Sequence, residues 1–184
     1  MIELQNLSLR FGEKQVLSDL QEVWPDSGTV LLRGASGSGK TTLLRVLAGL
    51  LVPDAGAVRG LKGRRIAMVF QEDRLLPWRT ALENVELISD RTTAKSLLEQ
   101  LDLADALDQR PEALSGGMRR RVALARALAF SDDVLLLDEP FNGLDAAHRA
   151  QAAGLLCCCS RLRIVATHSE EDADLLDAVA TLRL

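Results

Sequence analysis

Alternating apolar and polar residues open the chain. Between residues 2 and 9 isoleucine and leucine alternate with polar side chains, but the alternation loses its phase near Gln5-Asn6. A period of two predicts strands that bury one face, and the phase change predicts an interruption in the pairing. We therefore expect a mostly antiparallel N-terminal sheet. The apolar segments assigned to this sheet are 2–9, 16–17, 23–24 and 30–32.

The middle of the chain changes to helical spacing. Residues 29–51 have the pattern of a strand, a Gly-rich turn and an amphipathic helix; residues 53–65 are loop-like, and residues 66–70 form an apolar strand. From residue 80 to 113 apolar positions recur at three- and four-residue spacing, which predicts helices. Thr80 and Glu83 have the spacing of a capping box, and Pro111 closes the region.

The last third of the chain alternates strand and helix. Residues 134–137 form an unbroken apolar run, which is typical of a central parallel strand buried on both faces. A helix over 146–158, a strand over 163–167, a helix capped by Ser169 and a strand over 178–182 follow. This order predicts an α/β sandwich with an all-helical insertion between Gln71 and Leu114.

Length and composition fit one globular domain. The 184 residues suffice for a single core, so we expect one domain over residues 1–184. A net charge of -4 argues against a nucleic-acid partner. No apolar run approaches the roughly 18 residues of a membrane span, and the start of the chain lacks the basic region of a signal peptide. The consecutive Cys157, Cys158 and Cys159 have neither metal-ligand nor disulfide-framework spacing, so we interpret them as small apolar filler in a reducing compartment.

A glycine-rich motif connects the strand and helix expected in residues 29–51. Gly34-Ala35-Ser36-Gly37-Ser38-Gly39-Lys40-Thr41 fits G-x-x-x-x-G-K-[ST]. Such glycines let main-chain N–H groups turn inward around a phosphate, and the following helix adds its positive end. Lys40 can then reach the β- and γ-phosphates, while the Thr41 hydroxyl is placed for Mg²⁺. The motif predicts that a nucleoside triphosphate binds here.

Polar residues follow three of the expected strands. Asp138 and Glu139 follow residues 134–137, Gln71 follows 66–70, and His168 follows 163–167. Ligands of open α/β sheets bind at the carboxyl ends of the strands. We expect Asp138 to hold Mg²⁺ and Glu139 to polarise an attacking water. Gln71 can add an oxygen ligand to Mg²⁺ or position the water, and His168 can contact the γ-phosphate.

The segment LSGGMRRRVALARAL, residues 114–128, predicts a helix with an unusual start. Arg119, Arg120 and Arg121 lie in its first turns, where the helix dipole already presents positive charge. Cations are unfavourable there unless an anion compensates them. We expect the small residues before them to offer main-chain amides to such an anion, and the arginines to add a positive field around it.

These elements follow one another in a fixed order. The order is the glycine-rich loop, Gln71, LSGG, VLLLDEP (134–140), NGLD (142–145) and His168. The series resembles the nucleotide-binding subunit of the ATP-binding cassette (ABC) transporter family over nearly the whole chain. The resemblance implies an α/β phosphate-loop ATPase core with an N-terminal antiparallel β subdomain and an all-helical insertion of about residues 72–130. It also implies Mg²⁺-dependent hydrolysis of ATP to ADP and phosphate.

The resemblance assigns roles to single residues. Glu139 would be the catalytic base, supported by His168, Lys40 and Gln71, and Mg²⁺ would be held by Thr41, Gln71 and Asp138. Phe11 stands where the family usually has a Tyr that stacks on adenine, and it retains the aromatic face. The residues implied in ATP binding are Phe11, Gly34, Ala35, Ser36, Gly37, Ser38, Gly39, Lys40, Thr41 and Thr42.

Members of the family act as head-to-tail dimers, so a second copy of this chain is an implied partner. Each ATP would lie between the phosphate loop of one copy and Ser115, Gly116 and Gly117 of the other, which supplies the anion missing at residues 114–128. Asp145 would couple the two sites. Met118 replaces the Gln that usually follows LSGG, which removes one polar contact to that nucleotide.

Residues 71–85, QEDRLLPWRTALENV, resemble cassettes of the nitrate, sulfonate and taurine importer group. Importers of thiamine-precursor pyrimidines carry similar segments. The likeness implies permease subunits docked near Leu75–Trp78, a substrate-binding protein reached through them, and a place on the cytoplasmic face of the plasma membrane. The apolar residues 75–78 fit such a surface, and a local core beneath the helical insertion is the alternative. The short segment 53–65 and the short stretch after His168 depart from the family and imply a compact cassette, with reduced activity or a truncated gene as the alternatives.

Two other functions fit parts of the sequence. A soluble ABC ATPase of DNA repair or of the ribosome would carry a long coiled coil or a second cassette, and the sequence shows neither. A cassette that only binds ATP as a regulator would not need the complete set Lys40, Asp138, Glu139 and His168. We therefore expect an ATP-hydrolysing transporter subunit, with these two functions as the alternatives.

Overall fold

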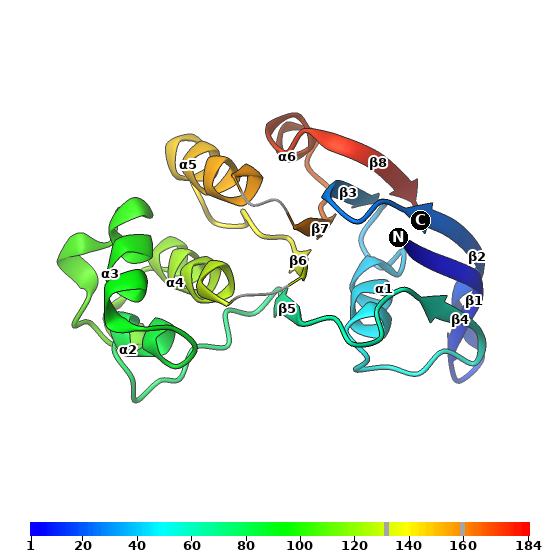
Figure 1. Ribbon diagram of the computed structural model, residues 1–184, viewed down its shortest axis with the longest axis horizontal. Helices are drawn as coiled ribbons and strands as arrows, with labels where there is room; N and C mark the ends of the chain where they lie inside the picture. Colours follow the sequence, from blue (N-terminus) through cyan, green and yellow to red (C-terminus); the bar gives the residue numbers. More distant parts are fainter. Residues whose placement is uncertain (131–132, 159–160) are drawn as a thin grey trace. The chain divides into compact units, whose positions relative to one another are not determined.

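The computed structural model describes residues 1–130, 133–158 and 161–184. The chain forms two compact units (Figure 1). The sheet unit comprises Met1–Met68, Asp132–Asp138 and Ser160–Leu184, and the helical unit comprises Val69–Ser131 and Glu139–Cys159. The chain thus passes from one unit to the other between Asp138 and Glu139, two consecutive residues that the sequence predicts to share a site.

A three-stranded antiparallel sheet opens the sheet unit. β1 (Ile2–Phe11) pairs with β2 (Lys14–Trp24) on one side and with β4 (Ala55–Arg59) on the other. The phase change expected near Asn6 is an irregularity of β1, because the register shifts between Leu4 and Leu7 and Asn6 adopts a left-handed φ of 49°. The apolar residues on both sides of the irregularity are thereby kept on the buried face.

Two strands differ from the sequence prediction. The loop expected over residues 53–65 contains β4, because pairing with β1 stabilises a strand that has no apolar alternation of its own. Gly56 permits this pairing, since a Cβ there would lie 2.3 Å from the Asn6 carbonyl oxygen. Residues 30–32 do not join the N-terminal sheet; they lie in β3 (Gly28–Arg33) of a second, parallel sheet, where they are buried.

The second sheet has the strand order β5-β6-β7-β3-β8. Its remaining strands are β5 (Ile66–Val69), β6 (Val134–Asp138), β7 (Leu162–Ala166) and β8 (Ala178–Arg183). β6 pairs with β7, β7 with β3 and β3 with β8, all in parallel. β6 is buried along its whole length, as its unbroken apolar run predicts. Helix α1 (Lys40–Leu47) packs against β6 and β7, and α6 (Glu170–Leu175) connects β7 to β8.

The helical unit contains the expected insertion and a further helix. Its helices are α2 (Ala81–Glu86), α3 (Arg91–Gln100), α4 (Gly116–Ala129) and α5 (Ala146–Cys157), with single turns at Ala104–Ala106 and Pro111–Ala113. α2, α3 and α4 pack on one another and bury Leu82, Leu98 and Leu124. In the described part of the chain, no helix is both long enough and apolar enough to span a membrane.

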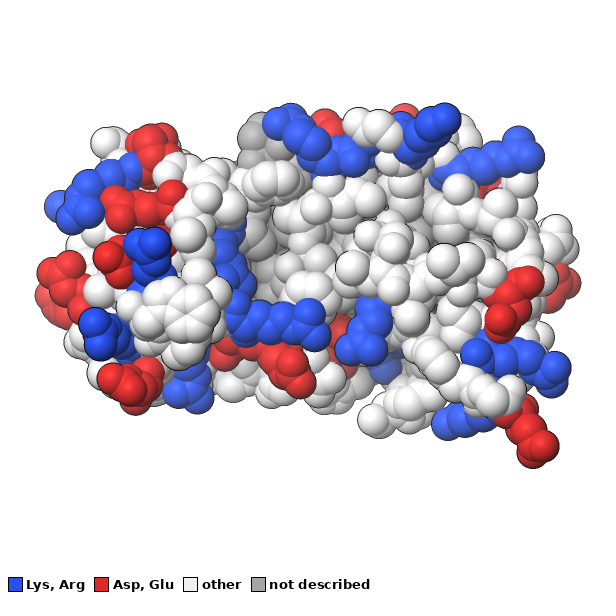
Figure 2. All heavy atoms as spheres, turned by 90° about the horizontal axis from the view of Figure 1, so that it is seen from below, with Lys and Arg blue, Asp and Glu red and all other residues white. Residues whose placement is uncertain are grey.

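The surface of these helices carries both signs of charge. At the left of Figure 2, Lys and Arg side chains lie among Asp and Glu side chains. Arg91 pairs with Glu86 at 3.0 Å, and Lys95 pairs with Glu99 at 3.7 Å. Exposed ion pairs of this kind add little to stability, so the helical unit depends on its apolar core.

Candidate active site

Three segments of the sheet unit that carry predicted site residues meet at the carboxyl edge of the parallel sheet. Ala166 of β7 is in register with Leu32 of β3 on one side and with Asp138 of β6 on the other. The glycine-rich loop begins two residues after Leu32, and His168 lies two residues after Ala166. The loop, Asp138 and His168 are therefore placed at the edge where α/β sheets bind their ligands.

The glycine-rich loop has a backbone conformation that requires glycine. Gly34, Gly37 and Gly39 have φ values of 156°, 79° and 106°. A Cβ on Gly34 would lie 2.5 Å from the Leu184 carbonyl oxygen, and one on Gly39 would lie 3.0 Å from the Val16 carbonyl oxygen. Gly39 is the N-cap of α1 and offers no side chain to the first amides of the helix. Amides left in this way at a helix start are donors for a phosphate group.

Lys40 is folded onto the same loop. Its Nζ donates to the carbonyl oxygens of Gly34 at 2.7 Å and of Ala35 at 3.0 Å, and the residue is only 7% exposed. The Ser38 hydroxyl is buried and has no hydrogen-bond partner among the described residues. Buried hydroxyl groups are normally hydrogen-bonded. A buried ammonium group, an unpaired hydroxyl and a helix start on one loop together fit a phosphate group.

Asp138 and Thr41 offer the oxygen ligands that Mg²⁺ prefers. Asp138 ends β6 and is 2% exposed, and Thr41 is half-buried in the first turn of α1, which packs against β6. A carboxylate buried to this degree needs a cation or hydrogen-bond donors around it. A carboxylate and a hydroxyl beside a phosphate loop fit Mg²⁺, which is usually held by few protein oxygens together with phosphate.

His168 is exposed on the turn between β7 and α6, and that turn is well fixed. Thr167 beneath it is fully buried, and its Oγ1 donates to Asp172 Oδ2 at 2.7 Å while it accepts from Ser169 N at 3.1 Å. These bonds hold the backbone that carries the imidazole at the edge of the sheet.

Phe11 lies at the end of β1, next to the turn that leads into β2. Its side chain is 52% exposed, which leaves the ring free to contact a ligand. Beyond the turn, β2 passes the phosphate loop, because Val16 and Leu17 are the residues that a Cβ on Gly39 would meet. The hairpin that carries Phe11 therefore runs alongside the phosphate loop.

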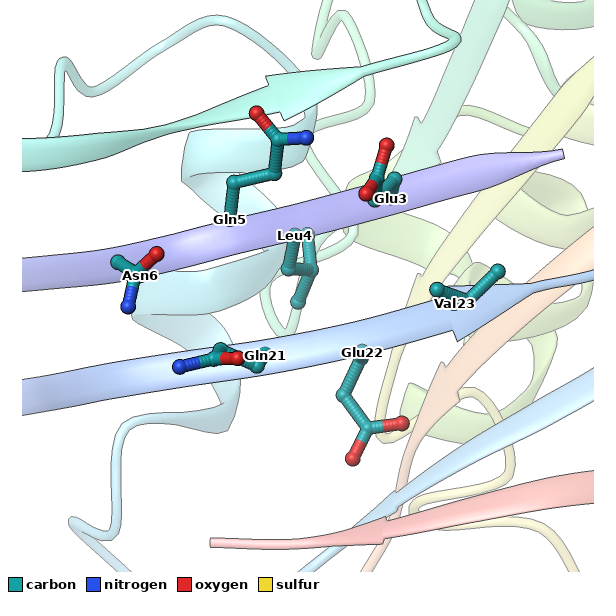
Figure 3. A pocket seen from close by; sticks show the side chains of 7 residues that line it. All are labelled: Glu3, Leu4, Gln5, Asn6, Gln21, Glu22 and Val23. Atoms are coloured by element: carbon teal, nitrogen blue, oxygen red, sulfur yellow. The ribbon is translucent and has the colours of Figure 1, made fainter.

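A separate pocket of about 440 Å³ opens on the antiparallel sheet (Figure 3). It is lined by Glu3, Leu4, Gln5, Asn6, Gln21, Glu22 and Val23. These residues occupy the half of the β1–β2 ladder away from the Phe11 turn, and none of them is expected to bind nucleotide. Two carboxylates in the lining disfavour an anionic ligand, so the pocket is not a candidate for ATP.

In the helical unit, the segments that carry Gln71 and Glu139 are both hydrogen-bonded to the same side chain, that of Arg120. Gln71 is exposed two residues after the end of β5, and Glu139 is half-buried at the start of the second segment of the unit. Arg120 of α4 donates to main-chain oxygens of both segments, with Nη1 2.6 Å from Phe70 O and Nη2 2.6 Å from Glu139 O. The backbones that carry Gln71 and Glu139 are therefore held beside each other within this unit.

The LSGG segment forms the start of α4. Ser115 is the N-cap, and its Oγ accepts a hydrogen bond from Met118 N at 3.2 Å. The Ser115 hydroxyl proton remains available for donation to an anion. Ser115 and Gly116 are exposed, whereas Gly117 packs against the loop 142–145, because a Cβ on Gly117 would lie 3.0 Å from Gly143 O.

Asp145 caps α5 at the end of that loop. Its carboxylate accepts from His148 N at 2.9 Å and lies 2.7 Å from His148 Nδ1. Hydrogen bonds from the main chain of His148, and then from its side chain, lower the pKa of Asp145 below its usual value. The carboxylate is thereby kept ionised and oriented by α5.

The similarity of the chain to known proteins identifies its family. Residues 17–142 match the family described as ABC transporter, which is more than half of the chain. The chain belongs to the ABC transporter family. Its fold is that of an ABC-type ATPase, and its enzymatic activity is the hydrolysis of ATP.

Relatives of this ABC cassette match it over most of its length. It is 42% identical over 191 residues to the aliphatic sulfonates import ATP-binding protein SsuB of Delftia acidovorans, which covers 99% of this chain and 79% of that protein. It is 44% identical over 164 residues to the SsuB of Zymomonas mobilis, with coverage of 84% and 68%. The dimeric post-hydrolysis structure of the ATP-binding cassette MJ0796 bound to ADP and Pi is 29% identical, has a TM-score of 0.89, and covers 100% of this chain and 94% of that one.

Two of the arginines of α4 in the cassette are buried. Arg120 and Arg121 are 2% and 7% exposed, and Arg121 Nη1 donates to the carbonyl oxygens of Leu101 at 2.7 Å and Asp102 at 3.0 Å. Burial lowers the pKa of Arg121, yet a guanidinium stays charged at physiological pH. Their N–H donors are thus engaged by carbonyl oxygens of their own chain and do not need a bound anion, whereas the positive field that their charge would add around such an anion stays a prediction. Helical spacing indicates their burial, since Arg120 precedes the buried Leu124 by one turn.

The segment expected to dock a permease is ordered by a buried amide. Asn84 is fully buried, and its Nδ2 donates to Leu76 O at 3.2 Å and Thr80 O at 2.9 Å while its Oδ1 accepts from Leu76 N at 2.8 Å. Leu75 and Leu76 are half-buried, but Trp78 is 64% exposed. Trp78 is therefore not part of a local core, and the indole is presented at the surface of the helical unit.

The interpretation of the consecutive cysteines as small apolar filler holds only in part. Cys157 is half-buried at the last residue of α5, but Cys158 is exposed, so the interpretation is wrong for Cys158. The helix ends at that point, and its last side chains no longer face the core. Cys159 lies outside the described residues.

Proposed function

We propose that this cassette energises an importer of aliphatic sulfonates. The observation that carries the proposal is the 42% identity, over 99% of the chain, to a relative named for aliphatic sulfonate import. The Zymomonas mobilis and Rhodococcus jostii relatives carry the same description at 44% and 43% identity. Aliphatic sulfonates are thus our first choice among the nitrate, sulfonate, taurine and pyrimidine solutes that residues 71–85 suggest.

In this proposal, residues 34–42 hold the ATP phosphates, and Phe11 stacks on adenine. Lys40 Nζ exchanges the carbonyl oxygens of Gly34 and Ala35 for phosphate oxygens, because a hydrogen bond to an anion is the stronger one. Glu139 accepts a proton from the water that attacks the γ-phosphate, and His168 contacts that phosphate.

Mg²⁺ completes the proposed site. Thr41, Asp138 and Gln71 are the residues that would hold the ion, whose charge neutralises the β- and γ-phosphates when it is bound. The burial of Asp138 supports this assignment, since a buried carboxylate gains most from a cation.

We propose further that two copies share each ATP. The exposed Ser115 and the amides of Gly116 and Gly117 would bind the nucleotide held by the phosphate loop of the partner copy. The Ser115 hydroxyl accepts from Met118 N and keeps its proton for donation to phosphate, which supports this role. Asp145 would couple the two sites, and Met118 would contribute one polar contact fewer than Gln. The dimeric state of the similar MJ0796 structures agrees with the arrangement.

Permease subunits are the remaining proposed partners. They would dock on the segment Leu75–Trp78, with a substrate-binding protein acting through them, and would keep the cassette at the cytoplasmic face of the plasma membrane. The exposed indole of Trp78 and the exposed Leu87 and Ile88 at the end of α2 support a docking role, because they leave apolar side chains uncovered.

Growth on a sulfonate tests the function directly. A strain from which the gene is deleted should not grow with an aliphatic sulfonate as its sulfur source, and the wild-type gene should restore growth. Glu139→Gln should not restore it, because the amide cannot accept the proton from water. Growth on sulfate is the control for general fitness. Unimpaired growth of the deletion strain on the sulfonate would contradict the proposed substrate.

A further inference from the structure

Arg120 is a buried arginine that binds the backbone of two different segments. Its Nη1 donates to Phe70 O at 2.6 Å, and more weakly to Gln71 O and Asp73 Oδ1 at 3.5 and 3.4 Å. On the other side, Nε donates to Pro140 O at 3.0 Å and Nη2 to Glu139 O at 2.6 Å. One planar guanidinium group thus joins the peptide that leads into Gln71 to the peptides that follow Glu139.

The backbone of Glu139 has a strained conformation, and the hydrogen bonds of Arg120 lie directly beside it. Its φ of 48° lies in the left-handed region, which costs a residue with a Cβ free energy. Pro140 follows, and a residue before proline normally adopts an extended conformation. Such a conformation persists only where the surrounding structure imposes it. Arg120 is part of that surrounding structure, since it binds the oxygens of Glu139 and of Pro140 directly after the strained torsion.

Arg120 also links these segments to the helix that begins with LSGG. It lies in the second turn of α4, whose N-cap is Ser115. Its neighbour Arg121 is equally buried but binds Leu101 O and Asp102 O at the end of α3, away from Gln71 and Glu139. Two adjacent buried arginines therefore have different partners, and Arg120 is the one that holds segments with proposed catalytic roles.

We propose that Arg120 is a positioning residue for ATP hydrolysis, which sets the backbone of Glu139 and of Gln71 relative to α4. The proposal rests on the catalytic roles given to those two residues above. Arginine is required because its fork reaches acceptors on two segments at once, whereas the single ammonium group of lysine reaches one cluster. Misplacing a reacting group by about 1 Å lowers a rate by roughly 100-fold.

Arg120→Lys, with Arg121→Lys as the matched control, tests the proposal. Both changes keep the positive charge and replace a buried fork in the same turn of α4, so they should lower the thermal unfolding temperature to a similar extent. In Arg120→Lys we expect kcat to fall by roughly 10- to 100-fold while KM for ATP stays within about 2-fold. Arg121→Lys should keep kcat within about 3-fold. Rates are expressed per ATP-binding site, so unfolded protein does not count.

A double-mutant cycle separates positioning from a general structural role. If Arg120 acts through Glu139 and Gln71, Arg120→Lys should cause no further loss of the residual hydrolysis in protein that already carries both Glu139→Gln and Gln71→Ala. A multiplicative loss in that background overturns the proposal, as does an unchanged kcat in Arg120→Lys. An equal fall of kcat in both lysine variants would also overturn it, because the effect would then be structural. Arg120→Gln, which retains one pair of N–H donors, serves as a second variant with the same expectations.

The outcomes distinguish this inference from the proposed site. Should Glu139→Gln hydrolyse ATP as fast as wild type, the proposed role of Glu139 fails, and the positioning role fails with it. Should Glu139→Gln be inactive while Arg120→Lys retains the wild-type kcat, only the role of Arg120 fails.

Discussion

Gly39 shows how closely the phosphate loop is fitted to the neighbouring strand. Its φ is 106°, and a Cβ there would lie 3.0 Å from both Leu17 Cδ2 and Val16 O. Gly39→Ala should therefore displace the loop, lower the free energy of unfolding by about 1–3 kcal/mol, and weaken ATP binding about tenfold or more. Calorimetric titration with ATP and thermal unfolding measure the two effects.

Gly37→Ala is the matched control for this prediction. Gly37 also has a positive φ, 79°, but nothing lies within 4 Å of a Cβ built on it, so its substitution carries only the conformational cost. A Gly39→Ala protein that binds ATP like wild type would show that the strand β2 does not constrain the loop.

At the residue scale, the sequence reveals side chains that act at fixed spacing. The turn of the glycine-rich loop is predicted in this way, because the spacing of Gly34, Gly39 and Lys40 itself defines it. Arg120 is not found, because its acceptors are main-chain oxygens that lie 20 and 50 residues away in the chain. No side-chain pattern marks where a carbonyl group points, so the function of such an arginine needs the fold.

At the element scale, the capping box of α2 makes a separate prediction. Glu83 N donates to Thr80 Oγ1 at 3.2 Å, and Thr80 N donates to Glu83 Oε2 at 2.9 Å. Thr80→Ala removes the first bond and should lower the free energy of unfolding by about 1 kcal/mol in urea titrations. Thr80→Ser keeps the hydroxyl and should remain within a few tenths of wild type. Equal stability of the Ala and Ser variants would mean that the cap contributes nothing here.

The helices and strands differ in whether nearby residues or distant pairing partners determine their structure. The capping box of α2 and the buried strand β6 are predicted because their signals lie within a few residues. β4 is missed because the sequence Ala-Gly-Ala-Val-Arg has no alternation, and only its partner β1 makes it a strand. β3 is assigned to the wrong sheet, because its partners β7 and β8 come more than a hundred residues later in the chain.

At the scale of the whole molecule, the proposed sharing of ATP predicts a change of oligomeric state. Glu139→Gln should bind ATP without hydrolysing it and accumulate as a dimer. The ATP-bound dimer persists because the hydrolysis that would separate the two copies does not occur. Gel filtration with saturating ATP and Mg²⁺ should show the dimer, and omission of ATP should return the monomer. Adding Lys40→Ala to this protein should prevent dimer formation. A monomer with ATP demonstrably bound would contradict the shared site.

The family itself is predicted from the order of motifs along the chain, and the match of residues 17–142 confirms it. The division into two units is less accessible to sequence, because the chain crosses between them inside the motif VLLLDEP. Asp138 belongs to the sheet unit and Glu139 to the helical unit, although one peptide bond joins them. A motif that looks continuous in sequence therefore links two separately packed parts.

The two tryptophans of the chain give each unit its own optical probe. Trp24 is 1% exposed in the sheet unit, and Trp78 is 64% exposed in the helical unit. A buried indole emits at shorter wavelength and is shielded from iodide, whereas an exposed indole is quenched. Fluorescence of a Trp78→Phe protein consequently reports the unfolding of the sheet unit. Fluorescence of a Trp24→Phe protein reports whether a membrane partner covers the docking segment, without any added label.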